Sequence, residues 1–577
     1  MQASDGFACS TGRRVSVRCG RSGEHMDRET RRQFEEFRRG AGPIENQVID
    51  DLLDGSCDRS GFLQRGAMFG LSISALGAAL AAAGEAPLAF ARSNRLQAGG
   101  RLKFGINGQP YGAIEPYTFN SISGVDVAAP SAEYLARITG RMVAVPELAL
   151  SWKANSAASR WTITLRPKVK FHTGQTMSAA DVIATYKRLT DPAQGSAALS
   201  NFKGVLSPDG ISAGGRNTVI FDLESPNAFF PYLIGSTSYQ SMILPASYQP
   251  GTFISKPQGT GPFVLKAYNT SVSATYDRFP RWWGGHTPLD GIDSTIYAAL
   301  PAMWAALLSG SIQLVDDGFD PSVDGKPNLH VYALPGASQG QVAMRVDMPP
   351  WNDYRVRQAL AYSIDRPTLA KALYGKRGTI GNDTPFSPAY PYTAKVPQRK
   401  QNLTLAKQLL AASGHPNGFS ATLTTGNEQY KKTIAEVVQA SAKKIGIDIT
   451  LELLDPSVYY GGSPTATPWL NAPFTVTTWA NRPTVMNYLT ATLITGGAWN
   501  AARYSNPKFD ALVKSFAAAI ALKDQRKYAK QMQLMLLHDT PNLSLAWAPI
   551  TSVGSTRVHG FPLLPIGISM GKVSLSK

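Results

Sequence analysis

Residues 161–165 (WTITL) alternate apolar and polar side chains, and this period of two predicts a half-buried strand. Ser178 then begins a helix as its N-cap, with Asp181 three residues later in the position of a capping-box partner. The helix is expected to end where Pro192 follows Asp191. Its apolar face comprises Val182, Ile183, Tyr186 and Leu189.

Three later segments, 354–364, 403–413 and 431–445, space their apolar residues as a helix does. Residues 447–453 alternate strictly and predict a strand directly after the third of these helices. We find no internal repeat and no long disordered linker within residues 100–577. The pattern therefore indicates a mixed α/β protein, and 577 residues are too many for one compact core.

The longest continuous apolar run covers residues 66–84. It follows Arg59 and precedes a small-x-small sequence at 89–91, the order of a secretory signal with its cleavage site. The alternative is a membrane anchor, but a run rich in Ala, Gly and Ser inserts weakly. Residues 58–64 resemble a twin-arginine export box in which Ser60 replaces the second arginine, so the export route stays open between the twin-arginine and general secretory pathways.

The charge and the cysteine content of the chain limit the classes of ligand and of metal site that it can have. Lys and Arg number 57 against 40 Asp and Glu, a net charge of +17. These basic residues are dispersed, without an arginine-rich arm, and export would separate the chain from nucleic acid. An anionic ligand, or weak attraction to acidic membranes, fits the charge better. All three cysteines precede residue 92, which excludes a disulfide framework and cysteine-ligated metal from the rest of the chain.

Local motifs for catalysis are absent from the sequence. There is no G-x-S-x-G, G-x-G-x-x-G or Walker A motif, and no two of the seven histidines have a metal-ligand spacing such as H-x-x-x-H. We therefore expect a protein that is not an enzyme, without a metal site or a cofactor.

Several separated segments resemble the extracytoplasmic solute-binding proteins of ATP-binding-cassette (ABC) importers, in the dipeptide, oligopeptide and nickel group known as family 5. The most specific is the strand–turn–helix of residues 161–192, with its core LRPKVKFHTG. The others are GTGPF (259–263), RWW (281–283), VRQALAYSIDR (356–366), AKQLL (406–410) and YSNPKFD (504–510). Together these matches cover roughly residues 100–550.

The resemblance implies an α/β, two-lobed periplasmic-binding-protein fold of class II, with an extra subdomain in the first lobe and a hinge between the lobes. The expected organisation is an export signal and extension at 1–91, a first lobe at 92–345, a second lobe at 346–540, and a return to the first lobe at 541–577. The hinge crossings are expected near 340–350 and 530–550.

The resemblance also implies a function. We expect a periplasmic protein, a monomer, that captures a peptide-like or other small organic solute, in one alternative an anionic one, and delivers it to an ABC permease in the inner membrane. A second interpretation is a ligand sensor that signals to a membrane receptor. A secreted hydrolase is a third, supported only by the cleft that the fold implies.

The segment that differs from the family's pattern is residues 478–484 (TWANRPT). In peptide-binding members a tryptophan is followed three residues later by an aspartate that pairs with the peptide's α-ammonium, whereas here Arg482 follows Trp479. A guanidinium repels an ammonium and suits a carboxylate or phosphate. The alternative is that Arg482 points to solvent or pairs with a structural acid. The predicted ligand-binding residues are Trp479, Asn481, Arg482, Trp499 and Arg503.

Overall fold

The computed structural model describes residues 99–576 apart from 111–112, 120, 257, 317 and 464, together with residues 35, 38, 46 and 49–52. The chain divides into two compact units, Met1–Ser93 and Asn94–Lys577. The predicted export signal, including Arg59, Ser60 and the apolar run, lies outside the described residues. No helix in the described part is long and apolar enough to cross a membrane.

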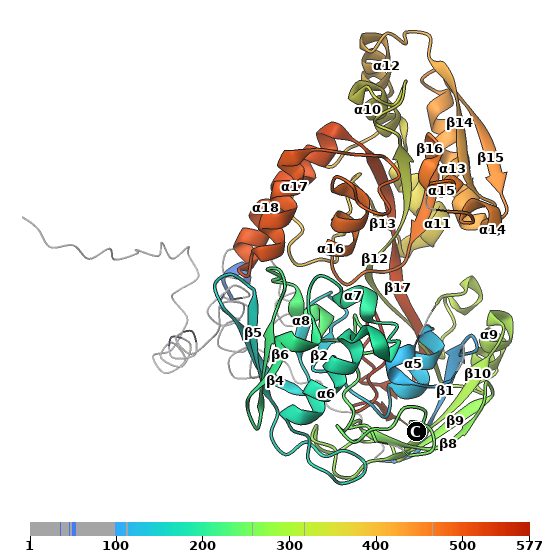
Figure 1. Ribbon diagram of the computed structural model, residues 1–577. Coiled ribbons are helices and arrows are strands. Elements are labelled where there is room, and N and C mark those ends of the chain that lie inside the picture. Colours follow the sequence, from blue (N-terminus) through green and yellow to red (C-terminus); the bar gives the residue numbers. More distant parts are fainter. Residues whose placement is uncertain are drawn as a thin grey trace, which may run out of the picture. The chain divides into compact units, whose positions relative to one another are not determined.

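One eleven-stranded sheet runs through the second unit, in the order β15-β14-β16-β12-β17-β11-β1-β10-β9-β8, with β13 beside β17. Its two longest strands, β12 (Leu329–Met344) and β17 (Asn542–Ser555), are antiparallel neighbours. β17 also pairs with β11, and β12 also pairs with β16. These two strands therefore join the two halves of the sheet, which we call the first lobe (β11 to β8) and the second lobe (β16 to β15) (Figure 1).

The first lobe contains parallel β1 and β10 and, beside them, a separate four-stranded sheet in the order β4-β5-β7-β6. The predicted strand and helix are confirmed as β5 (Arg160–Leu165) and α6 (Ala179–Thr190), with the Ser178–Asp181 capping box formed. Buried side chains of α6 and β5 share one apolar core.

The remaining strands of this lobe and its carboxyl-terminal return are β1 (Arg101–Asn107), β2 (Ala136–Ile138), β3 (Ala144–Pro146), β4 (Ala149–Ala154), β6 (Ile211–Gly215), β7 (Thr218–Asp222), β8 (Phe263–Asn269), β9 (Ser273–Arg278), β10 (Gly291–Tyr297), β11 (Leu314–Val315), β18 (Val558–His559) and β19 (Ser574–Leu575). Its other helices are α5 (Ile122–Ala128), α7 (Leu199–Phe202), α8 (Phe230–Leu233) and α9 (Leu300–Leu308).

The second lobe packs helices against three parallel strands, β14 (Phe419–Gly426), β15 (Ile447–Leu454) and β16 (Phe474–Trp479). The predicted helices and the predicted strand are confirmed as α10 (Tyr354–Ser363), α12 (Leu403–Ala412), α13 (Gln429–Lys443) and β15. The other elements are α11 (Arg366–Tyr374), β13 (Thr379–Ile380), α14 (Pro456–Tyr459), α15 (Pro468–Asn471), α16 (Met486–Tyr488), α17 (Pro507–Ala518) and α18 (Leu522–Asp539).

A buried ion cluster ties the start of α11 to the loops that follow it. The carboxylate of Asp383 is 2.6 Å from Nη2 of Arg366 and 2.8 Å from Nη1 of Arg399. All three side chains are almost completely excluded from solvent. Arg399 also donates hydrogen bonds to Leu537 and to Thr540, so the cluster reaches the end of α18.

A buried carboxylate also lies in the first lobe. Glu133 accepts hydrogen bonds from the indole Nε1 atoms of Trp282 (2.9 Å) and Trp283 (2.8 Å) and from Oγ1 of Thr260 (2.9 Å). Burial, together with the nearby charge of Glu147, raises the pKa of Glu133 to about 8 despite these donors. Glu133 therefore holds a proton in the folded chain at pH values where the unfolded chain has released it.

This difference predicts a pH dependence of stability. Between about pH 4.5 and 8 the folded chain binds the Glu133 proton more tightly than the unfolded chain, so the free energy of unfolding falls as the pH rises through this window. Urea unfolding midpoints at pH 5, 6, 7 and 8 should fall more steeply for the wild type than for Glu133→Gln. Parallel pH profiles of the two proteins would contradict the prediction.

Candidate ligand-binding site

The candidate site lies at the carboxyl ends of the three parallel strands of the second lobe. β14 is parallel to both β15 and β16, so the segments that follow Gly426, Leu454 and Trp479 emerge at the same edge of the sheet. Open α/β sheets bind ligands in the crevice outside these carboxyl ends. Because β16 pairs with β12, this edge is also next to the strands that join the lobes.

A lysine at the start of α13 is the most deeply buried cation of this edge. Lys431 is only 3% exposed, and its Nζ lies 2.5 Å from Oε1 of Glu428. The same ammonium lies over the rings of Tyr460, at 4.3 Å, and Tyr459, at 5.3 Å. The second carboxylate oxygen of Glu428 is buried and accepts no hydrogen bond from any described residue. The edge thus combines the paired ammonium of Lys431, an acceptor oxygen of Glu428 that is free to bind a donor, and two aromatic rings.

A cavity of about 300 Å³ opens beside this pair. Its walls come from β12, β16, β17, α11 and α13, and therefore include both strands that join the lobes. The lining residues are Ser338, Tyr374, Glu428, Tyr430, Lys431, Thr478 and Ala548.

The two predicted tryptophans come together at this edge. Trp479 ends β16, is 8% exposed, and donates from Nε1 to Oε1 of Gln341 on β12 at 3.1 Å. The ring of Trp499 packs on it with a centroid distance of 5.6 Å and remains 43% exposed. Trp469 and Tyr488 complete the contacts, at 6.2 and 6.1 Å. The group forms an aromatic wall whose outer ring is open to solvent.

Two other predicted residues use their side chains within the protein. Oδ1 of Asn481 accepts a hydrogen bond from the backbone of Ala337 at 2.8 Å, and its Nδ2 donates to the carbonyl of Pro565 at 3.4 Å. Arg503 donates from Nη2 to Oδ1 of Asn471 at 2.7 Å. Asn481 therefore ties the site's edge to β12 and to the carboxyl-terminal segment, and Arg503 fixes a neighbouring loop.

Arg482 differs from both. Its backbone carbonyl accepts a hydrogen bond from Tyr390 Oη at 2.7 Å, which fixes the position of the residue. The side chain is half-buried, and its guanidinium makes no hydrogen bond or ion pair with any residue that the structure describes. The sequence left open that Arg482 pairs with a structural acid, but no acid among the described residues pairs with it.

Sequence reasoning missed Gln339, which lies opposite Trp479 on β12 and is fully buried. Neither atom of its carboxamide has a hydrogen-bond partner among the described residues. It also missed the Lys431–Glu428 pair, which the pattern of 431–445 assigns simply to a helix. The available signal for Gln339 was its alternation with Gln341 just before the expected hinge crossing.

The described part of the chain contains no group of three or more His, Cys, Asp or Glu side chains placed to hold a metal ion. The charged groups at the strand edge are instead two cations, Lys431 and Arg482, and two carboxylates, Glu428 and Asp455. Asp455 already accepts hydrogen bonds from the backbone and hydroxyl of Ser457, as the N-cap of α14. Such a set suits an organic solute with an anionic group and hydrogen-bond donors.

Comparison with known proteins adds sequence relatives. A family profile described as "Bacterial extracellular solute-binding proteins, family 5 Middle" matches residues 143–501. Heme-binding protein A of Haemophilus influenzae is 28% identical over 467 residues, which cover 73% of this chain and 82% of that protein. The glutathione-binding protein GsiB of Escherichia coli is 24% identical over 475 residues, 79% of this chain and 91% of the relative.

Solved structures share the fold. The periplasmic murein tripeptide-binding protein MppA, in its unliganded open form, superposes with a TM-score of 0.74 at 20% identity, over 84% of this chain and 98% of the other. The binding protein DppA of Helicobacter pylori, in complex with the peptide STSA, superposes with a TM-score of 0.62 at 22% identity, over 83% of this chain and 99% of the other.

Proposed function

The chain belongs to the bacterial extracellular solute-binding proteins of family 5, and on this premise we propose that it captures a small, anionic, peptide-like solute between its two lobes. Members of this family are the solute-binding components of ABC importers, and the chain has that role. The proposal concerns the chemistry of the solute, the residues that bind it and the motion that encloses it. Delivery to a permease in the inner membrane, after export directed by residues 1–91, is part of the same proposal.

The unpaired guanidinium of Arg482 is the observation that carries the choice of an anionic solute. The side chain is half-buried beside the aromatic wall, where an unpartnered charge is costly unless a ligand supplies the counter-charge. A carboxylate accepts two parallel hydrogen bonds from a guanidinium. The aspartate that peptide-binding members use for the α-ammonium is replaced here, so the solute presents an acid rather than an amine at this position.

The rest of the edge supports a solute with amide groups as well as an acid. Gln339 offers a donor and an acceptor that lack partners, and the free oxygen of Glu428 offers an acceptor. Glutathione, the ligand in the name of one relative, is a tripeptide with two carboxylates and therefore illustrates the class. The tryptophans supply the apolar surface against which such a solute packs.

We propose that the hinge lies where β12 and β17 lose regular pairing. Their register shifts between Pro335 and Ser338 and again between Gln339 and Gln341, beside the cavity. In this proposal the first crossing lies at the start of the 340–350 range expected from the sequence, and the second lies in β17. Rotation of the lobes about this position would enclose the solute between them.

The test is small-angle X-ray scattering on the mature chain, before and after addition of the solute that co-purifies with the natively exported protein, identified by mass spectrometry. Closure should lower the radius of gyration in proportion to the bound fraction. A solute that binds tightly without any change in radius would contradict the closing motion. A co-purified solute with no acidic group would contradict the proposed chemistry.

A further inference from the structure

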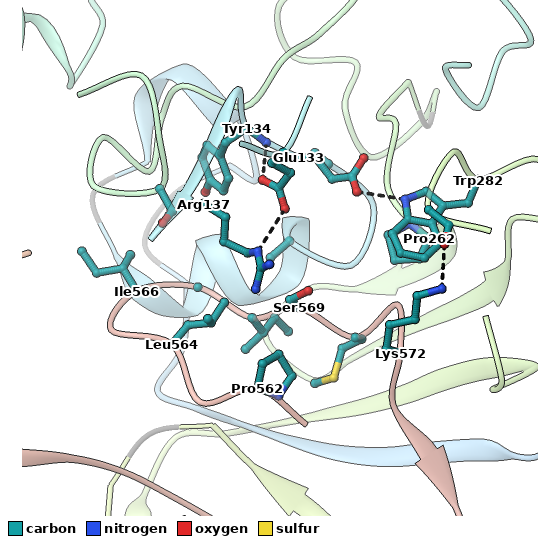
Figure 2. Close-up of a pocket in the computed structure, with 18 of the residues that line it drawn as sticks. Glu133, Tyr134, Arg137, Pro262, Trp282, Pro562, Leu564, Ile566, Ser569 and Lys572 are labelled. Atoms are coloured by element: carbon teal, nitrogen blue, oxygen red, sulfur yellow. Dashed lines mark hydrogen bonds and ion pairs between the residues drawn. The ribbon is translucent and has the colours of Figure 1, made fainter. Parts of the chain in front are cut away.

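A second cavity, of about 380 Å³, lies within the first lobe. It is enclosed by residues 129–137, 146–147 and 282–284 and by the carboxyl-terminal return segment 560–572 (Figure 2). None of its lining residues lines the cavity at the edge of the second lobe. The volume exceeds the roughly 150 Å³ that accommodates benzene, so it can hold a ring with a polar substituent.

Most of the wall is apolar. Two tryptophans and apolar side chains of the return segment line it, as in small-molecule sites where a few polar groups set the orientation. The apolar lining residues are Ala129, Ala132, Pro146, Pro262, Trp282, Trp283, Pro562, Leu564, Ile566, Ile568 and Met570.

Arg137 is the basic group best placed to bind a ligand here. It is 33% exposed, and its nearest acidic atom, Oε1 of Glu147, lies 3.9 Å from its Nε, which is beyond hydrogen-bond distance. The guanidinium makes no hydrogen bond with the residues described by the structure. In Figure 2 it projects toward Ser569 across the cavity. Its donors are therefore available to an entering group.

The acids of the cavity are less available than this cation. Glu133 is turned toward Trp282 and already accepts three hydrogen bonds (Figure 2). Glu147 is 12% exposed and accepts from the backbone of Tyr134 at 3.2 Å. Lys572 adds a second cation at the rim, where its Nζ donates to the carbonyl of Gly284 at 2.6 Å. Because three donors already occupy the carboxylate of Glu133, the two cations Arg137 and Lys572 remain beside one carboxylate, that of Glu147.

We propose that this cavity is a second binding site, for a small organic acid with an apolar or aromatic body, whose carboxylate pairs with Arg137. The site is additional to the solute site between the lobes and does not depend on it. The ring packs between the tryptophans and the return segment, and the carboxylate makes hydrogen bonds with the guanidinium.

The test uses three probes of one shape and different charge: 4-fluorophenylacetate, 4-fluorophenylacetamide and 4-fluorophenethylamine. Fluorine NMR line broadening on the mature chain should show saturable binding of the acid and clearly weaker binding of the amide and the amine. Arg137→Gln should weaken the acid by at least about tenfold, because a charge-assisted hydrogen bond is lost. Arg137→Lys should restore part of the binding.

Two further variants keep the test decisive. Glu147→Gln removes the acid that competes for Arg137 and should tighten the acid probe, an outcome that general loss of structure would not produce. Arg216→Gln, at an exposed arginine of the first lobe that does not line the cavity, should leave acid binding unchanged. Acid binding that survives Arg137→Gln, that is lost with Arg216→Gln, or that the amide equals would overturn the inference, as would no binding at all. None of these results bears on closure around the co-purified solute.

Discussion

Replacing Arg482 by alanine is expected to weaken binding of the acidic co-purified solute by about 30-fold or more. Loss of one partner of a desolvated charge pair costs about 2–5 kcal/mol, mostly through faster release, and 1.4 kcal/mol is a factor of ten in affinity. The effect should be large here because the half-buried guanidinium has no other partner among the described residues. Isothermal titration calorimetry of the wild type and the variant measures it.

Three variants separate a specific anchor from general electrostatics. Arg216→Ala removes an exposed arginine of the first lobe and should leave the affinity nearly unchanged. Trp479→Ala should weaken any solute, because it removes apolar wall rather than charge. Arg482→Asp should reduce binding of the acid further, and is expected to admit peptides with a free α-ammonium. Equal affinity of wild type and Arg482→Ala would remove the anionic anchor and leave the family and the fold intact.

Asp383→Asn is expected to lower the free energy of unfolding by about 3–5 kcal/mol, the usual cost of breaking a buried ion pair by removing one partner. The loss arises because Arg366 and Arg399 would then share a buried site without a counter-charge. Asparagine keeps the shape of the side chain and tolerates the positive φ of 54° at this position, so the backbone should not change. Urea unfolding of the mature chain measures the shift.

The matched control is Asp222→Asn, which breaks the exposed pair with Arg160 between β5 and β7. Its unfolding midpoint should remain close to that of the wild type, since solvent screens such a pair. Similar midpoints for Asp383→Asn and the wild type would show that the buried cluster contributes no net stability.

Local patterns predicted the elements well, because a capping box and a period of two are written within a few residues. The α6 helix and the strand β15 are examples. Whether a polar side chain is free for a ligand depends instead on partners far along the chain. Asn481 and Arg482 are adjacent in sequence, yet only the first has its side chain bound, to Ala337 and Pro565.

The same reason explains what was missed. The cavity at the strand edge combines Ser338 of β12, Thr478 of β16 and Ala548 of β17 with the start of α13. These segments are far apart in the sequence, so no local pattern could predict that they line one cavity. The sequence does not show that β12 lies between β16 and β17. Only in this position is the carboxamide of Gln339 seen to be buried without a partner among the described residues. The resemblance located Arg482, and the structure then showed which neighbours it lacks.

The long pair of strands β12 and β17 gives the protein a mechanical property. Because one hydrogen-bonded ribbon belongs to the sheets of both lobes, the closing motion proposed above would twist this ribbon rather than rotate two flexible loops. Distortion of the ribbon away from its preferred twist would cost free energy, and binding of the solute would supply it. The net free energy of binding is then the free energy of the contacts with the solute, reduced by the cost of distorting the ribbon. In the proposed transport cycle, relaxation of the ribbon at the permease would favour release of the solute.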